Sequence, residues 1–200
     1  RRLLPLFFGL ATLFALTAGR AATPRTPHVK ATLVAADTIA QPGKPLSVAL
    51  RLQHDPHWHT YWENPGTGLP TEITWQLPAG WQAGPIQWPA PILLKDKQGN
   101  VVGNGYEGDL LLPVTITPPA DLPPCAPLAL QARAEWLMCE QVCIPGSANL
   151  NLSLPVASEA PAADPQWGSK IRDVLANLPR ADSAWTFAAT RAGKTITLTV

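Results

Sequence analysis

Proline is the feature that most restricts how this chain can fold. Twenty-three of its 200 residues are prolines, and they recur along the length of the chain. Because a proline inside a helix removes a hydrogen bond and clashes with the preceding turn, helices must be short. The segments between the prolines are rich in Val, Ile, Leu and Thr, which favour strands. The pattern therefore predicts an all-β domain built from short strands.

Alternation within these segments indicates strands with one buried face. In residues 128–137, apolar residues from Leu128 to Trp136 fall at every second position, with Gln131, Arg133 and Glu135 between them. Such a period of two is typical of a half-buried strand. Turns with proline, glycine or aspartate separate the segments, as in sandwiches, and we predict an immunoglobulin-like β-sandwich. The six predicted strands are residues 31–38, 46–53, 71–77, 110–117, 128–137 and 148–154.

The first 22 residues have the pattern of a secretory signal peptide. Arg1 and Arg2 precede a 16-residue apolar run that ends at Ala18, and small residues follow. We expect this segment to export the domain to the periplasm, where disulfides persist. Without residues 1–22 the chain has 12 basic and 14 acidic residues, a net charge of about −2. This balance gives no reason to expect a nucleic-acid partner.

Composition divides the rest of the chain into parts. The predicted sandwich covers residues 29–156, and the Ala- and Pro-rich residues 157–165 read as a linker. Apolar residues then follow helical spacing over 166–178, with Asp164 as a plausible N-cap. Two strand-like segments, residues 184–190 and 194–200, come next. We therefore expect residues 166–200 to be the start of a second, incomplete β domain with one short helix.

Two of the three cysteines, Cys139 and Cys143, are four positions apart. In an extended strand they would be about 13 Å apart, whereas a disulfide needs Cα atoms about 4.4 to 6.8 Å apart. The backbone must therefore turn at residues 140–142, through a hairpin tip or a single helical turn. A bridge over so short a loop stabilises by only about 2 kcal/mol, so thiol-disulfide exchange competes with a structural bridge and metal binding as its role. The third, Cys125, reads as a free thiol, with an intermolecular bridge as the alternative.

Histidine and tryptophan gather in residues 54–70. His57 and His59 share one face if this stretch is extended, and with Met138 and the cysteines they could bind copper. A periplasmic copper-binding or copper-tolerance domain is therefore one alternative, and a non-catalytic interaction module is another. The nearby tryptophans are best explained by packing in the core and loops: these are Trp58, Trp62, Trp75, Trp81 and Trp88.

Four blocks of sequence resemble a known family. In chain order they are HWHTYWENPGTGLPTEITWQLPAGW, GPIQWPAP, GYEGDLLLPVTITPP and AEWLMCEQVCIP. They resemble the N-terminal periplasmic domain of the thiol:disulfide interchange protein DsbD family, especially the branch near the suppressor-of-copper-sensitivity proteins. The resemblance covers residues 29–156. Three residues separate the cysteines here, whereas other branches have five, so the loop geometry and the partners can differ.

The resemblance implies a protein-disulfide reductase domain that needs no cofactor. It implies that the domain takes electrons from a membrane-embedded domain of the same inner-membrane-anchored protein and passes them to periplasmic thiol-disulfide proteins. The family's context is cytochrome c biogenesis and copper tolerance. The resemblance also implies that Cys139 and Cys143 are the exchanging dithiol.

The resemblance also implies groups around the dithiol. A cap loop, residues 95–108, would cover the sulfurs, and its glycines would let it open. Tyr106 and Glu107 in this loop, together with His59 and Tyr61 in the facing segment, would lie near the sulfurs. A carboxylate such as Glu107 or Glu140 would favour a protonated thiol through like-charge repulsion.

Overall fold

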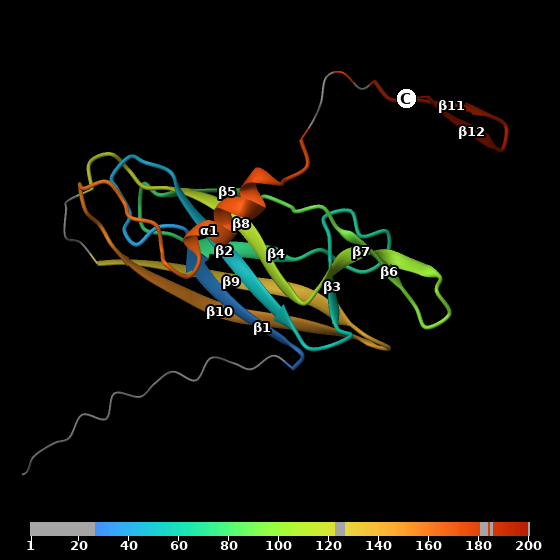
Figure 1. Cartoon of the computed structure of the whole chain (residues 1–200), viewed down its shortest axis with the longest axis horizontal. Helices are drawn as coiled ribbons and strands as arrows, with labels where there is room; N and C mark the ends of the chain where they lie inside the picture. The colour runs from blue at the N-terminus through green and yellow to red at the C-terminus, as the bar shows by residue number, and fades with distance from the viewer. Residues whose placement is uncertain (1–26, 123–126, 181–183, 185, 200) are drawn as a thin grey trace, which may run out of the picture.

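The computed structural model describes residues 27–122, 127–180, 184 and 186–199. The predicted signal peptide and Cys125 lie outside these residues. Within them the chain folds as a β-sandwich of two antiparallel sheets (Figure 1), and the predicted fold class is confirmed. No helix in the described part of the chain has the length and apolar character needed to cross a membrane.

The first sheet has the strand order β1-β2-β8-β5. Its strands are β1 (Val29–Ala35), β2 (Leu46–His54), β8 (Asp109–Thr117) and β5 (Gln82–Ile86). The second sheet has the order β10-β9-β3-β7-β6, and β4 pairs with the middle of β9, residues 131–135. Its strands are β10 (Cys143–Pro155), β9 (Pro127–Cys139), β3 (His59–Tyr61), β7 (Val101–Glu107), β6 (Ile92–Lys95) and β4 (Glu72–Gln76).

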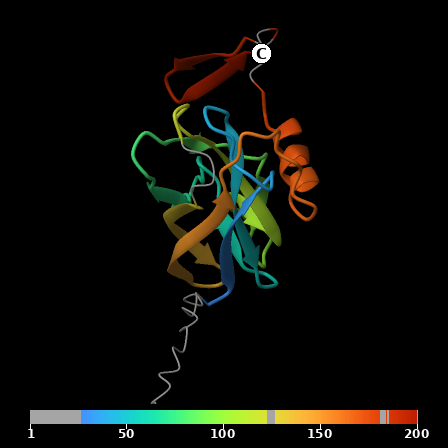
Figure 2. The same ribbon diagram turned by 90° about the vertical axis from the view of Figure 1, so that its left-hand side faces the viewer.

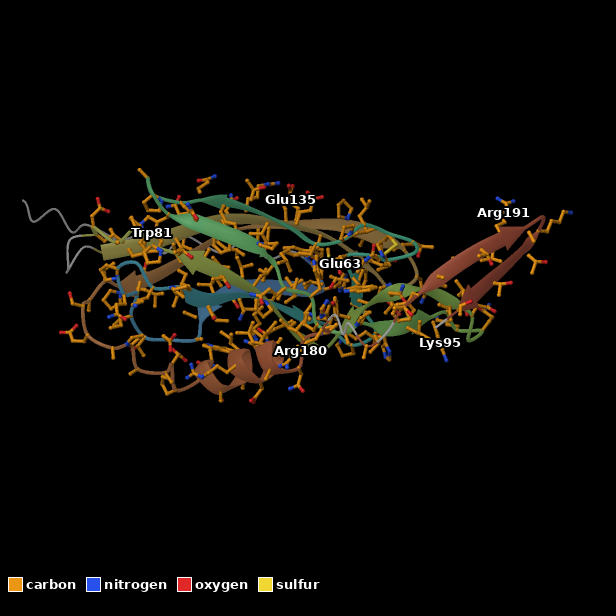
Figure 3. All side chains as sticks on the ribbon, turned by 90° about the horizontal axis from the view of Figure 1, so that it is seen from above. Glu63, Trp81, Lys95, Glu135, Arg180 and Arg191 are labelled. Carbon is orange, nitrogen blue, oxygen red and sulfur yellow. A yellow bond between two sulfur atoms is a disulfide. The ribbon has the colours of Figure 1, made fainter. Side chains whose placement is uncertain are left out.

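The core fills the space between the sheets, as the alternation in the strands requires. Leu50, Leu112 and Leu130 are fully buried, and Trp58 and Trp81 are buried in the same cluster. Polar positions of β9 face outward, and Figure 3 shows Glu135 on the outer side of the sheet. The tryptophans predicted to pack do so, either within this core or against it.

The helix α1 (Gly168–Ala176) covers the outer face of the first sheet (Figure 2). Its Ile171 is fully buried in a small cluster with Val34, Ala49 and Leu111. The Asp164 carboxylate accepts hydrogen bonds from the backbone N–H groups of Gln166 and Trp167, so it caps the turn that leads into the helix.

The segment expected to be a linker is held along the sandwich. Thr38 donates its backbone N–H to the carbonyl of Ala162, and Ala157 donates to the carbonyl of Ala40. Composition alone suggested a spacer because no apolar periodicity runs through residues 157–165. These contacts are made by the backbone, so they leave no trace in side-chain composition.

The last described element is the hairpin of β11 (Ala188–Ala192) and β12 (Thr195–Thr199). It matches the strand pair expected there, and Figure 1 shows it extending away from the sandwich. Every residue of both strands is exposed.

Candidate functional site

The cysteine pair lies at the tip of the β9–β10 hairpin. β9 ends at Cys139, β10 begins at Cys143, and the two residues are directly opposed in the antiparallel register. Their Cα atoms are 4.2 Å apart and their sulfurs form a disulfide. Of the two geometries that the spacing allowed, the chain adopts the hairpin, with the predicted turn at residues 140–142.

The two cysteines differ in exposure. Cys139 is only 3% exposed and packs with Tyr61 and Leu94. Cys143 is exposed at the start of the edge strand β10. The sulfur of another molecule can therefore approach Cys143, whereas Cys139 is covered.

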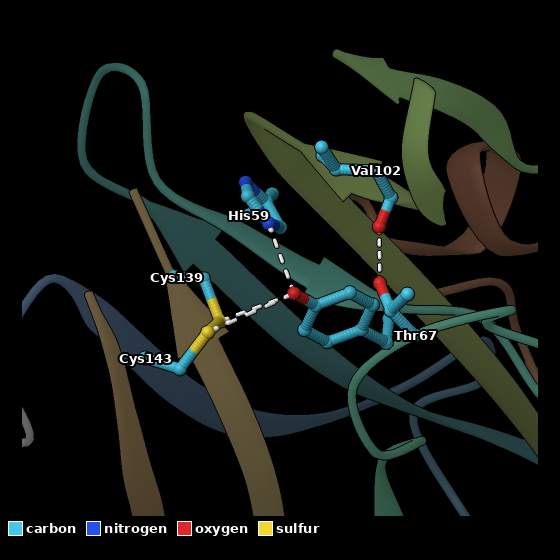
Figure 4. Close-up of a disulfide and its surroundings, with 6 residues drawn as sticks. His59, Thr67, Val102, Cys139 and Cys143 are labelled. Atoms are coloured by element: carbon cyan, nitrogen blue, oxygen red, sulfur yellow. Dashed lines mark hydrogen bonds between the residues drawn. A yellow bond between two sulfur atoms is a disulfide. The ribbon is translucent and has the colours of Figure 1, made fainter. Parts of the chain in front are cut away.

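The short strand β3 carries the groups that cover Cys139. His59 is opposite Cys139 in the sheet, and because side chains alternate, His59 and Tyr61 point to one face and Thr60 to the other. The Tyr61 hydroxyl donates a hydrogen bond to Cys139 Sγ at 3.2 Å and is 3.8 Å from Cys143 Sγ. His59 Nε2 lies 3.4 Å from the same hydroxyl (Figure 4). Both predicted neighbours on this strand thus lie beside the disulfide.

The Tyr61 ring is fixed by the loop that follows β3. A Cβ atom on Gly68 would lie 2.5 Å from the ring, so only glycine allows this approach, and its φ of +80° also favours glycine. Thr67 donates its hydroxyl to the carbonyl of Val102 and so ties the loop to β7 (Figure 4). The sequence reasoning missed both residues, although the glycines of the stretch from Pro65 to Leu69 indicated a tightly shaped loop.

The predicted cap loop is a β-hairpin formed by β6 and β7. At its tip, Asp96 accepts hydrogen bonds from the backbone of Gln98 and Asn100, which closes the turn. A cleft of about 570 Å³ lies between this tip and the cysteine hairpin. Its lining includes both cysteines, the hairpin residues Lys95, Asp96, Lys97 and Gln98, and the acidic side chains Glu107 and Glu140.

Burial sets the protonation of the two groups beside the disulfide. It lowers the pKa of His59 below its ordinary value, and the carboxylate of Glu107 opposes this shift. Burial raises the pKa of Tyr61. At neutral pH, His59 is therefore a neutral imidazole and Tyr61 keeps its hydroxyl proton.

A second histidine, His54, supports β3 from the opposite face. Its Nδ1 donates to the carbonyl of Gly108 at 2.8 Å, so its Nε2 is free to accept a hydrogen bond from the hydroxyl of Thr60 at 2.9 Å. Burial lowers the pKa of His54, which favours this neutral state. The sequence placed His54 in the histidine cluster but gave no sign of this role.

The two cap-loop residues predicted to lie near the sulfurs point to opposite faces of β7. Glu107 lies opposite His59 and lines the cleft. Tyr106 points to the other face of β7, where it joins the sandwich core and donates its hydroxyl to the carbonyl of Pro89 at 2.7 Å. Tyr106 therefore packs, because neighbouring residues of a strand face opposite sides.

The alternative copper ligands do not converge. Met138 is fully buried in the sandwich core, on the face of β9 opposite to Cys139, while His59 and His57 line the cleft. Within the described ranges, no group of three or more His, Cys, Asp or Glu side chains is arranged to hold a metal ion.

One comparison with known proteins identifies a family, and another supports the fold. Residues 30–155 match the sequence model of the family described as thiol:disulfide interchange protein DsbD, N-terminal. No curated protein sequence matches the chain. Among solved structures, the N-terminal periplasmic domain of ScsB from Proteus mirabilis is similar, with a TM-score of 0.63 and 20% sequence identity. That match covers 88% of this chain and 65% of the ScsB chain, and at this identity it supports the fold alone.

Proposed function

Because the chain belongs to the family of DsbD N-terminal domains, we propose that it is a periplasmic domain that exchanges electrons with other proteins through Cys139 and Cys143. In this proposal a membrane-embedded domain of a larger protein supplies the electrons, and periplasmic disulfide proteins receive them. The single observation that carries the proposal is the disulfide at the hairpin tip, with one cysteine exposed at the cleft and the other covered.

The difference in exposure gives each cysteine a role. In the reduced domain, the Cys143 thiolate attacks a disulfide of the partner, and one partner sulfur leaves as a thiolate. Cys139 then attacks Cys143 Sγ, which restores the disulfide and releases the second partner sulfur. The partner gains two electrons, and the domain returns to its Cys139–Cys143 disulfide form.

The position of the bridge favours exchange over a structural role. A disulfide stabilises a fold mainly by closing a loop in the unfolded chain, and the loop from Cys139 to Cys143 is worth only about 2 kcal/mol. The opposed strands β9 and β10 already hold the two residues together through a long register. The bridge therefore adds little to the fold, whereas its place at a cleft suits a reacting partner.

Electron transfer to a partner tests this function. The reduced domain is mixed with an oxidised periplasmic thioredoxin-fold protein, and free thiols on each protein are counted by alkylation and mass spectrometry. We expect thiols to move from the domain to the partner, and a variant with both cysteines replaced by alanine to transfer none. If periplasmic dithiols cannot reduce the disulfide, and its reduction potential lies below about −300 mV, the disulfide is structural and the proposal is wrong.

Val142, between the two cysteines, is expected to contact the partner. It is 64% exposed and directly precedes Cys143 at the hairpin tip, so we expect a partner that docks at Cys143 to contact it. We predict that Val142→Asp lowers the second-order rate constant with the partner about tenfold, because the apolar contact is lost and a carboxylate is added beside Glu140. Stopped-flow tryptophan fluorescence measures the rate.

Ile196→Asp is the matched control for this change. Ile196 is 66% exposed on the separate hairpin, so the same substitution there should leave the rate unchanged. Dithiothreitol needs no docking surface, so its reaction with the Val142 variant measures the effect of the added charge on Cys143 itself. This reaction should be slowed less than the reaction with the partner. Equal slowing by both substitutions would contradict a docking role for Val142.

A further inference from the structure

Three side chains form a connected line that ends at the covered sulfur. His59 Nε2 is 3.4 Å from Tyr61 Oη, and Tyr61 Oη is 3.2 Å from Cys139 Sγ (Figure 4). The hydroxyl has a single hydrogen, which can turn toward the sulfur or toward the imidazole. The geometry therefore provides a path for a proton between Cys139 and His59.

Cys139 has little direct access to water. Its residue is 3% exposed, and Tyr61 is 5% and His59 9% exposed. A thiol at this position must lose its proton before it can attack, because the thiolate is the nucleophile. The hydroxyl of Tyr61 is the hydrogen-bond partner of its sulfur in the structure.

We propose that Tyr61 and His59 form a proton relay that serves Cys139 when it attacks the mixed disulfide on Cys143. Tyr61 is the catalytic residue, since it touches the reacting sulfur, and His59 is a positioning residue that accepts the proton through it. This inference rests on the proposed function, in which Cys139 resolves the mixed disulfide.

The step balances in atoms and electrons. The Cys139 thiol gives its proton to Tyr61 Oη, and the hydroxyl proton of Tyr61 passes to His59 Nε2. The electron pair left on Cys139 Sγ forms the bond to Cys143 Sγ. The bond between Cys143 and the partner breaks, and its electron pair leaves with the partner thiolate. His59, now an imidazolium, releases the proton to the water of the cleft that it lines.

The surroundings of His59 keep it ready to accept a proton. Burial lowers its pKa below the ordinary value of 6.5, so the imidazole is neutral at pH 7 and becomes protonated as the pH falls. Glu107 on β7 raises the pKa, and His54 lies behind β3 as a neutral ring. The remaining charged or titratable groups of the cleft are His57, Glu140, Lys95, Asp96 and Lys97.

A small disulfide reagent isolates the step. Dithiobis(nitrobenzoate) reacts with the reduced domain and releases a coloured thiolate when Cys143 attacks it. A second coloured thiolate appears when Cys139 resolves the mixed disulfide, and this phase does not depend on reagent concentration. In the unmodified protein we expect the second phase to be level around pH 7 and to slow as the pH falls through the pKa of His59.

The variants His59→Gln and Tyr61→Phe break the relay at different points. Each should slow the second phase by about tenfold to about a hundredfold at pH 7. In each, the rate should fall about tenfold per pH unit below the ionisation of the thiol, because only thiolate then reacts. The double variant should be no slower than either single one, since both act on one path.

Other outcomes would overturn the relay. A His59→Gln variant with the pH profile of the unmodified protein, or single effects that multiply in the double variant, would show a structural role only. If a variant fails to fold, the pH profile of the unmodified protein still tests the relay. A second-phase rate that falls tenfold per pH unit with no level region around pH 7 would exclude it. The reagent replaces the partner protein, so failure of the proposed function would appear in the partner assay and not here.

Discussion

The Cys139→Ala variant is expected to react once with an oxidised partner and then to remain covalently attached to it through Cys143. Cys143 is exposed and can attack, but no second thiol remains at the hairpin tip to release the partner. The partner is used with a single cysteine, activated as a mixed disulfide with thionitrobenzoate, so that no second partner thiolate can reverse the attack. Non-reducing electrophoresis and mass spectrometry should show a stoichiometric adduct, and dithiothreitol should reduce its disulfide and separate the two proteins. Turnover of the partner should be abolished.

The Cys143→Ala variant is the matched control, because it removes the same disulfide and leaves one cysteine at the same tip. Its remaining Cys139 is 3% exposed beneath Tyr61. We expect its adduct to form at least about a hundredfold more slowly. Equal rates of adduct formation would contradict the roles assigned to the two sulfurs.

Both variants should remain folded, so the comparison reports on chemistry. Loss of a bridge over so short a loop costs about 2 kcal/mol, and the β9–β10 register continues from the cysteines to the far end of both strands. Thermal unfolding of the two variants should therefore give similar midpoints, each below that of the oxidised protein.

The strands with an apolar or alternating sequence pattern could be predicted, and four others could not. All six predicted segments are strands, because each is a run of strand-forming apolar residues and several of them alternate with polar ones. The strands that were not predicted are β3, β5, β6 and β7. β3 has three residues, and β5 contains the Gly84-Pro85 pair, which normally signals a turn. Their pairing depends on neighbours distant in sequence.

The site was predicted in outline because its chemistry is local. Cys139 and Cys143 are close in sequence, so a turn between them was required by the length of a disulfide. The faces of β7 were not predictable, since a shift of one residue exchanges Tyr106 and Glu107 between the core and the cleft. The close contact between Gly68 and the Tyr61 ring forms only in the folded protein, so the spacing of residues in the sequence could not predict it.

The backbone of β7 approaches β3 so closely that Gly105 is expected to tolerate no side chain. Gly105 is opposite Tyr61 in the sheet. A Cβ atom there would lie 2.9 Å from Leu94 Cδ1 and would collide with the carbonyl of Thr60. Because that contact is with backbone, it can be relieved only by moving β3 away from β7.

We therefore predict that Gly105→Ala lowers the free energy of unfolding by about 3 kcal/mol, measured by urea denaturation. The matched control is Gly84→Ala in β5, whose Cβ would lie 3.5 Å from the carbonyl oxygen of Thr115 in ordinary contact; we expect a change within about 0.5 kcal/mol. Since β3 carries His59 and Tyr61, displacing it should also uncover Cys139. Alkylation of reduced Gly105→Ala by iodoacetamide should then label Cys139 faster than in the unmodified protein. A stable Gly105→Ala variant with a protected Cys139 would contradict this prediction and would mean that the close approach of β7 to β3 is not needed to cover the sulfur.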